Sequence, residues 1–209
     1  MKKRAGRPSL GEAYKIQERI LAAAAKLFEV YNFKAVSIRQ IAEEADVSVA
    51  MVSYYFVDKA GLFAHLLDQV FSKIQEQIKV IDADENLSII DFIKSYSNLL
   101  IENPWFPVFL AKEVYFGDSA LKASVLSRYS EDINPLLLDM INQEIEKGNF
   151  REDIDPKFAL ITIGSLLHHP WTIKATATKD SSNLSYTTEA MEKLMQHNCK
   201  MFLYGVTER

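Results

Sequence analysis

The chain lacks several features that define whole classes of protein. It has one cysteine, Cys199, in 209 residues, which excludes an intrachain disulfide and a thiolate metal cluster. Cys199 is therefore expected to be a partly buried thiol of a reduced compartment. No apolar run approaches the roughly 18 residues that span a bilayer. The basic start MKKRAGRPSLGEAYK leads into no apolar segment, so we expect no secretory signal and a cytoplasmic protein without a membrane partner.

Motifs of catalysis and of cofactor binding are also missing. The sequence has no paired-carboxylate, Ser-His-Asp, phosphate-loop or metal-ligand pattern. His168 and His169 are adjacent, and a helix would place their side chains about 100° apart, which is poor geometry for chelating a metal. We therefore expect no metal, no cofactor and no enzymatic activity.

Net charge is −4, but the charge is unevenly distributed. Residues 1–70 contain ten Lys or Arg and eight Asp or Glu, a balance of +2, and the remainder carries 14 positive and 20 negative residues, a balance of −6. The first fifteen residues are the most polarised, with five basic side chains against Glu12 alone. A local basic patch on an acidic protein can still bind DNA, because phosphates respond to nearby charge.

Apolar residues recur at three- and four-residue steps through most of the chain, which predicts helices. The first runs from Ile16 to Tyr31, and Asn32 is expected to end it in the left-handed conformation. Later helices are expected at 58–82, 87–102, 104–116, 119–147, 156–175 and 186–204, with an interruption near Pro135 and a kink or break at Pro170. No strand pair or repeat is evident. We predict an all-α fold of about nine helices.

The most informative segment is residues 37–56. Ser37 and Gln40 match a capping box at the start of one short helix, and Ser48 is a natural N-cap for a second. The three residues Asp46-Val47-Ser48 connect them, which is helix-turn-helix spacing. Val52 and Phe56 are four residues apart and share one face of the second helix. With that face turned inward, the outward positions are Val49, Ala50, Ser53 and Tyr54.

Residues 16–67 resemble the DNA-binding domain of the TetR family. The resemblance is carried by ILAAAAKLF, SIRQIAEEADVS, the YYF ending and DKAGLF. Many members have glycine where this chain has Asn32 and Asp46, which are turn positions that Asn and Asp tolerate. Many also have Thr-Leu-Tyr where this chain has Met51-Val52-Ser53. The usual tyrosine contact of the family is therefore absent at Ser53.

The resemblance implies three parts. Residues 1–13 would form a flexible basic arm, residues 14–74 a DNA-binding domain with its helix-turn-helix at 37–56, and residues 75–209 a larger helical domain for ligand binding and dimerisation. Arg39 would approach the DNA backbone or a base, and Lys59 would meet a phosphate at a helix start. The DNA-binding set implied in this way is Ser37, Arg39, Ser48, Val49, Ala50, Met51, Ser53, Tyr54, Tyr55 and Lys59. Three of these have a structural alternative: Lys59 can simply be solvated, and Met51 and Tyr55 can pack in the core.

Two features are left open between structural and functional readings. The arm with Arg4 and Arg7 either enters a minor groove or is a solubilising tail. The resemblance also implies an effector pocket, and aromatic residues cluster where it would lie, although packing in a core explains each of them equally well. The candidate pocket residues are Trp105, Phe106, Phe109, Tyr115, Phe116, Met140, His168 and Trp171.

The last helix has an apolar stripe from Met191 to Phe202, and Gly164 and Ser165 permit close approach on the helix before it. These two helices can pair with their copies in a homodimer, or the stripe can face the core of its own subunit.

The expected function is a DNA-binding transcription regulator, a repressor released from a palindromic operator by a small organic effector. The alternative is an architectural or cell-division-related DNA-binding protein of the same fold without an effector.

Overall fold

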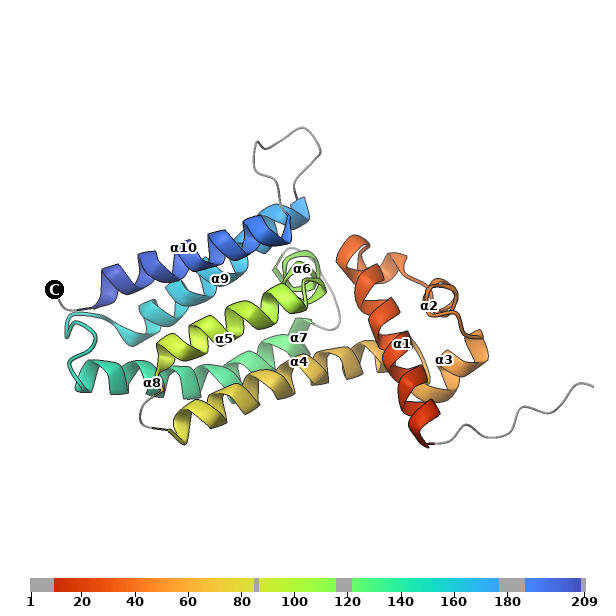
Figure 1. Ribbon diagram of the computed structural model, residues 1–209, viewed down its shortest axis with the longest axis horizontal. Coiled ribbons are helices and arrows are strands. Elements are labelled where there is room, and N and C mark those ends of the chain that lie inside the picture. Colours follow the sequence, from red (N-terminus) through yellow and green to blue (C-terminus); the bar gives the residue numbers. More distant parts are fainter. Residues whose placement is uncertain (1–9, 85–86, 116–121, 177–186, 208–209) are drawn as a thin grey trace, which may run out of the picture. The chain divides into compact units, whose positions relative to one another are not determined.

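The computed structural model describes residues 10–84, 87–115, 122–176 and 187–207 (Figure 1). Within these ranges the regular structure is helical, and the one β-type pairing is a single bridge between Phe150 and Thr207. The prediction of an all-α fold is thus confirmed. The chain divides into two compact units, residues 1–68 and 69–209, with the division somewhat earlier than the predicted position after residue 74.

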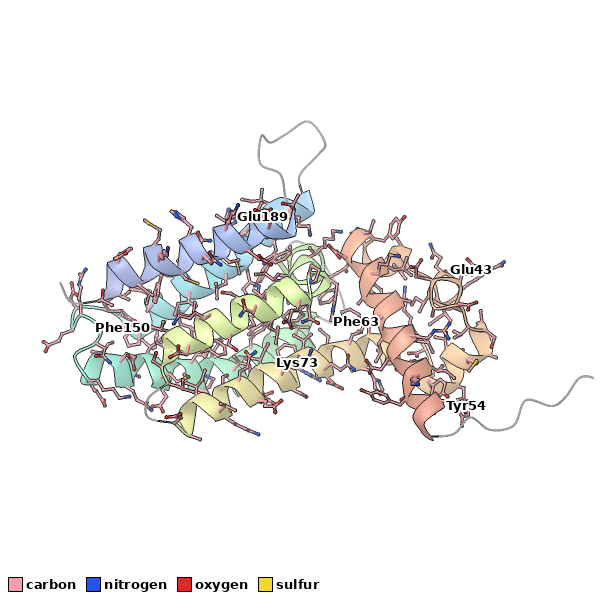
Figure 2. All side chains as sticks on the ribbon, in the orientation of Figure 1. Glu43, Tyr54, Phe63, Lys73, Phe150 and Glu189 are labelled. Carbon is pink, nitrogen blue, oxygen red and sulfur yellow. The ribbon has the colours of Figure 1, made fainter. Side chains whose placement is uncertain are left out.

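The N-terminal unit is built from short helices around an aromatic centre. Its elements are α1 (Leu10–Val30), the single turn η1 (Phe33–Ala35), α2 (Ile38–Glu44), α3 (Val49–Phe56) and the start of α4 (Lys59–Asp82). The rings of Phe28, Phe33 and Phe63 lie 5.1 to 5.6 Å apart between centroids. Phe63, labelled in Figure 2, is fully buried and Phe28 nearly so, so this cluster holds α1 against α4.

Two predictions about this unit are wrong. Helix α1 begins at Leu10, so residues 10–13 are its first turn and not part of an arm. Asn32 has an extended backbone (φ −65°, ψ 151°) and precedes η1, so it does not end α1 in the left-handed conformation. The turn of η1 takes over that role, because it reverses the chain toward α2 without a left-handed residue.

The C-terminal unit is a bundle of longer helices. After the remainder of α4 it contains α5 (Ile89–Glu102), α6 (Trp105–Phe109), η2 (Leu110–Tyr115), α7 (Lys122–Ser127), η3 (Arg128–Ile133), α8 (Asn134–Glu146), α9 (Pro156–Thr176) and α10 (Thr188–Val206). Helix α9 packs on α6, α8 and α10, and α10 also packs on α5 (Figure 1). None of the helices described is both long and apolar enough to cross a membrane.

Local sequence explains where these helices begin and end. Asp155 Oδ1 accepts a hydrogen bond from Lys157 N at 2.8 Å, ahead of Pro156 at the start of α9. Gly148 has a φ of +72° after α8, a conformation that glycine adopts without a steric cost. Pro170 lies inside α9 without breaking it. The segments η2 and η3 are π-helical, which the sequence pattern did not predict.

Candidate functional site

Two serine caps hold the helix-turn-helix, as predicted. Ser37 Oγ accepts from Gln40 N at 3.2 Å, and the Gln40 side chain accepts from Ser37 N at 2.8 Å, which completes the capping box of α2. Ser48 Oγ accepts from Met51 N at 3.2 Å at the start of α3. These caps satisfy backbone N–H groups that a helix start leaves unpaired.

The turn between α2 and α3 is held by a residue that the sequence analysis missed. Asp46 has a φ of +52°, the left-handed conformation that Asp tolerates better than most residues. Arg19 of α1 donates from Nη2 to the carbonyls of Ala45 (2.6 Å) and Asp46 (3.0 Å). Its position on α1 gave no indication of this contact, because it depends on how α1 packs on α2.

Helix α3 presents a small, weakly polar surface. Val52 and Phe56 are buried in the unit, so the opposite side of α3 faces outward. Met51 and Tyr55 are half-buried, and the exposed residues are Ser48, Val49, Ala50, Ser53 and Tyr54. Tyr54 is 69% exposed and lies at the surface of the unit (Figure 2).

The two predicted residues on α2 are accessible as well. Ser37 and Arg39 are exposed. Arg39 Nε donates to Glu43 Oε1 at 3.0 Å within the same helix. This is a solvent-exposed ion pair, which contributes little stability, so the guanidinium remains able to exchange Glu43 for another acceptor.

Lys59, which is predicted to meet a phosphate, makes contacts within its own unit. Its ammonium donates to the backbone carbonyls of Phe33 and Val36, both at 2.7 Å, and lies 4.4 Å from the centroid of the Phe33 ring. Lys59 therefore ties the turn η1 to the start of α4. The sequence analysis did not anticipate these two contacts, because the carbonyls come from a segment that the helix pattern did not resolve.

The junction between α3 and α4 is tightly constrained. Val57 has φ +64° and ψ −63°, and Asp58 N donates to Phe56 O at 2.7 Å across it, which is the geometry of a γ-turn. Asp58 Oδ1 accepts from Gly61 N at 2.7 Å, as a cap of α4. A Cβ on Gly61 would lie 2.4 Å from Phe56 O, so only glycine fits there. The end of α3 is thus fixed in place.

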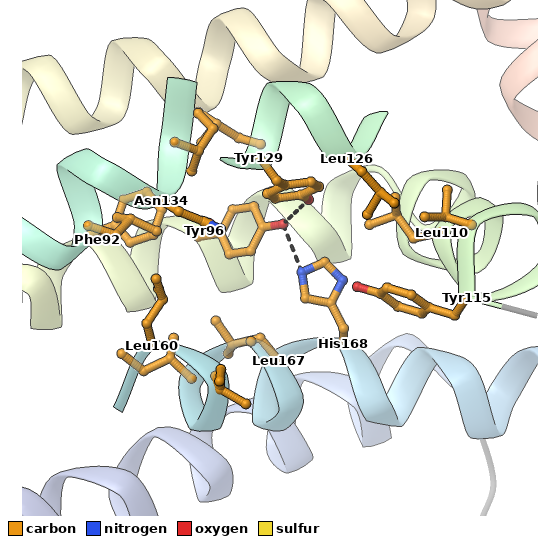
Figure 3. A pocket seen from close by; sticks show the side chains of 17 residues that line it. Phe92, Tyr96, Leu110, Tyr115, Leu126, Tyr129, Asn134, Leu160, Leu167 and His168 are labelled. Atoms are coloured by element: carbon orange, nitrogen blue, oxygen red, sulfur yellow. Dashed lines mark hydrogen bonds between the residues drawn. The ribbon is translucent and has the colours of Figure 1, made fainter. Parts of the chain in front are cut away.

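A pocket of about 270 Å³ lies within the C-terminal unit (Figure 3). Its walls are mostly apolar and come from α4, α5, η2, α7, η3, α8 and α9. The lining residues are Ile74, Phe92, Tyr96, Leu110, Val114, Tyr115, Leu126, Tyr129, Ile133, Asn134, Leu137, Leu160, Ile161, Ile163, Gly164, Leu167 and His168.

One wall of the pocket carries a connected polar group. Tyr96 Oη lies 3.0 Å from Tyr129 Oη and 2.9 Å from His168 Nε2 (Figure 3). Burial lowers the pKa of His168 to about 4, so the ring is neutral at pH 7. Burial raises the pKa of Tyr96 and of Tyr129 above the ordinary tyrosine value. Among the described residues, His168 Nδ1 has no hydrogen-bond partner.

The structure brings only part of the predicted pocket together. Tyr115 and His168 line it. Five other candidates are buried but do not line this pocket. They pack in the core, which was the alternative interpretation of the aromatic cluster: Trp105, Phe106, Phe109, Met140 and Trp171. Phe116 lies outside the described residues, as do Arg4 and Arg7 of the arm. The sequence analysis missed Tyr96 and Tyr129, because their helices gave no sign that they converge on His168.

The outer faces of α9 and α10 expose large apolar side chains. Phe158 and Met201 are 69% and 57% exposed, and both border a shallow groove between the two helices. Ile161 and Tyr204 are exposed on the same helices. By contrast, Met191, Met195 and Phe202 of the predicted stripe are buried within their own unit. The stripe therefore divides between the core and the surface.

Comparison with known sequences places the N-terminal unit in a family. The model of the family described as bacterial regulatory proteins, tetR family, matches residues 20–66. The HTH-type transcriptional repressor NicS of Pseudomonas putida is 28% identical over 161 residues, which cover 75% of this chain and 76% of NicS. The probable HTH-type transcriptional regulator YttP of Bacillus subtilis is 26% identical over 163 residues, which cover 74% and 76% of the two chains.

Solved structures share the fold over nearly the whole chain. The ketosteroid transcriptional regulator KstR2 of Mycobacterium tuberculosis has a TM-score of 0.69 at 18% identity, over 92% of this chain and 95% of that one. The fatty acid degradation regulator FadR from Bacillus halodurans has a TM-score of 0.66 at 16% identity, over 90% and 98%. The solved structures show the fold, and the helix-turn-helix geometry, the family model and the sequence relatives together indicate a DNA-binding transcriptional regulator whose N-terminal unit is of the TetR type.

Proposed function

We propose that this regulator is a homodimeric repressor that leaves a palindromic operator when a small organic molecule fills the pocket of its C-terminal unit. The observation that carries the proposal is an apolar pocket with a buried, unsatisfied histidine nitrogen in a chain whose other unit presents an exposed recognition helix. A pocket of this kind is typical of small-molecule sites. A fully packed interior would instead have favoured the alternative of an architectural protein without an effector.

The DNA-reading surface in this proposal is the outward side of α3 together with Arg39. Ser37 and Ser48 at the two helix starts, and Met51 and Tyr55 at the edges of α3, complete it. Lys59 acts behind this surface, since its ammonium is engaged by two carbonyls of the same unit. Two copies of the surface are needed to read both halves of a palindrome.

The dimer interface in this proposal is the outer face of α9 and α10. A contiguous exposed apolar patch on a soluble protein is commonly an interaction site, and this one includes Phe158 and Met201 along one groove. Paired helices from two copies would form a four-helix bundle around a twofold axis.

Helix α4 provides a route from the pocket to the DNA-binding unit. It begins at Lys59 in the N-terminal unit and continues into the C-terminal unit, where Ile74 lines the pocket. An occupant that favours one position of α4 over another shifts the population between states that fit and do not fit two successive major grooves.

The test combines operator selection with effector titration. Duplexes selected from a random pool by the purified protein give the operator, and anisotropy of a labelled operator then reports binding. Compounds that bind the protein alone, found by a shift in melting temperature, are titrated against the complex. We expect at least one compound to lower the affinity of the protein for the operator by about 5- to 150-fold. Selection of a palindrome together with indifference to every bound compound would support the architectural alternative instead.

A further inference from the structure

The hydrogen-bonded group in the pocket has a definite direction. A phenol O–H is a better donor than an imidazole N–H, and an imidazole nitrogen is a better acceptor than a phenol oxygen. Tyr96 therefore donates to His168 Nε2, and its oxygen accepts from Tyr129.

This direction fixes the tautomer of His168. A neutral imidazole carries one proton, and the ring is neutral because burial holds its pKa near 4. With Nε2 accepting from Tyr96, the proton lies on Nδ1. The His168 residue is more than nine-tenths buried, and its Nδ1 has no hydrogen-bond partner among the described residues. It faces the side of the pocket that Tyr115 forms (Figure 3). A buried donor of this kind favours a ligand that supplies an acceptor.

The remaining walls restrict what the ligand can be. None of the lining residues is Lys, Arg, Asp or Glu, and outside the polar group the walls are nearly all apolar. An ion placed there would lose its hydration without a counter-charge. The volume of about 270 Å³ is just below the usual range for small-molecule pockets, about 300–1,000 Å³, so the ligand must be compact.

We propose that the pocket selects compact, uncharged molecules whose carbonyl oxygen accepts a hydrogen bond from His168 Nδ1–H. This inference rests on the proposed function in that the pocket is the effector site. It adds the chemical class of the effector: a neutral ketone, ester, lactone or amide with an otherwise apolar body.

The first experiment compares three probes of similar shape at pH 7 by calorimetry with the full-length protein. They are 4-phenyl-2-butanone, which has a neutral carbonyl, butylbenzene, which has no acceptor, and 3-phenylpropanoate, which is an anion. The ketone is expected to bind roughly two- to tenfold tighter than the hydrocarbon, the range of one net hydrogen bond. The carboxylate is expected to bind weakest. Equal affinity for ketone and hydrocarbon, or tighter binding of the carboxylate, overturns the proposal.

The matched variants are His168→Gln and His169→Gln. Glutamine at 168 keeps an amide near the position of Nε2 for Tyr96 but has no group at the position of Nδ1. It is expected to remove the preference for the ketone while hydrocarbon binding persists. His169 is exposed and does not line the pocket, so its variant is expected to behave as wild type. A ketone preference that survives His168→Gln overturns the assignment.

A spectroscopic measurement keeps the test independent of whether that variant folds. The ¹⁵N shifts of the imidazole rings at pH 7 distinguish the two neutral tautomers. His168 is identified as the ring that stays neutral when pH is lowered to 5. We expect its proton on Nδ1, and a proton on Nε2 would refute the proposal. If the ketone binds as described but leaves operator affinity unchanged, the pocket chemistry stands and the proposed release function fails.

Discussion

At the scale of single residues, Lys59 shows how a charged side chain can serve the fold of a DNA-binding unit. Lys59→Met keeps the stem and the contact with Phe33 but removes the donors to two carbonyls. Because two partly buried acceptors lose their partner, we expect a loss of about 1–3 kcal/mol in unfolding free energy by urea titration. The slope of operator affinity against salt concentration should not change. A slope reduced by about one unit per subunit would return Lys59 to the phosphate backbone.

Val57 is a β-branched residue in a conformation that only glycine adopts easily. Its φ of +64° lies in the γ-turn that joins α3 to α4, and the side chain is 80% exposed. Val57→Gly should therefore raise the unfolding free energy by about 1 kcal/mol, because relieved strain exceeds the added entropy of the unfolded chain. Gly61→Ala should do the opposite, since its Cβ would press on Phe56 O. Denaturant midpoints of both variants measure this, and destabilisation by both would contradict the account.

His168 makes stability depend on pH in a definite direction. Its pKa is about 4 in the folded protein and 6.5 in the unfolded chain, so only the unfolded state takes up the proton as pH falls from 6.5 toward 4. The contribution of neutral His168 is therefore complete above pH 6.5 and is lost toward pH 4, by up to about 3 kcal/mol. Comparing unfolding free energies of wild type and His168→Gln at pH 7.5 and 5 isolates this residue. Parallel losses in both proteins would contradict it.

At the scale of elements, the sequence predicted the features that depend on residues close together in the chain, such as helix starts. The capping residues Ser37, Ser48 and Asp58 are recognisable in the sequence because each lies within three residues of the N–H it accepts from. The outward side of α3 followed from Val52 and Phe56 alone. The π-helical turns and the turn η1 could not be predicted, since packing against distant segments determines them and no short-range pattern marks them.

The pocket, too, depends on packing between distant segments that the sequence could not predict. Aromatic residues were the only available guide, but a buried aromatic residue packs in a core as readily as it lines a cavity. Trp105 and Trp171 are in the core, whereas Tyr96 and Tyr129 converge on His168 from α5 and η3. Tyr129 follows Tyr96 by 33 positions in the chain, and His168 follows Tyr96 by 72 positions. No spacing rule relates residues so far apart.

The composition of helix α3 predicts which bases the operator contains. Its residues 49–56 include no Arg, Lys, Asn or Gln, which are the side chains that make two-pronged contacts to guanine or adenine. Its exposed apolar groups suit thymine methyls, so we expect half-sites rich in T where α3 docks, with any guanine preference depending on Arg39. Selection from random duplexes with wild type and Arg39→Ala measures both. Half-sites without T at those positions, or guanine retained by Arg39→Ala, would show the prediction to be wrong.

At the scale of the whole molecule, the proposed dimer ties DNA affinity to the surface of α9 and α10. Met201→Glu replaces an apolar side chain of the groove with a carboxylate and should weaken self-association at least tenfold, because burying a charge in an interface is costly. Operator affinity should fall with it. Val80→Glu is the matched control, since Val80 is also 57% exposed but lies on α4. Sedimentation at several concentrations measures the effect, and a dimer unaffected by Met201→Glu would exclude this face.

The π-helical turns have a consequence for how such a pocket can diversify. Residues of η2 and η3, among them Leu110, Tyr115 and Tyr129, form part of its wall. A π turn holds one residue more than an α turn, so the loss of a single codon in either segment restores the regular helix, removes one residue from that part of the wall and leaves the helix beyond it nearly in phase. Specificity in this architecture can thus change in one insertion or deletion event, a larger step than any single substitution provides.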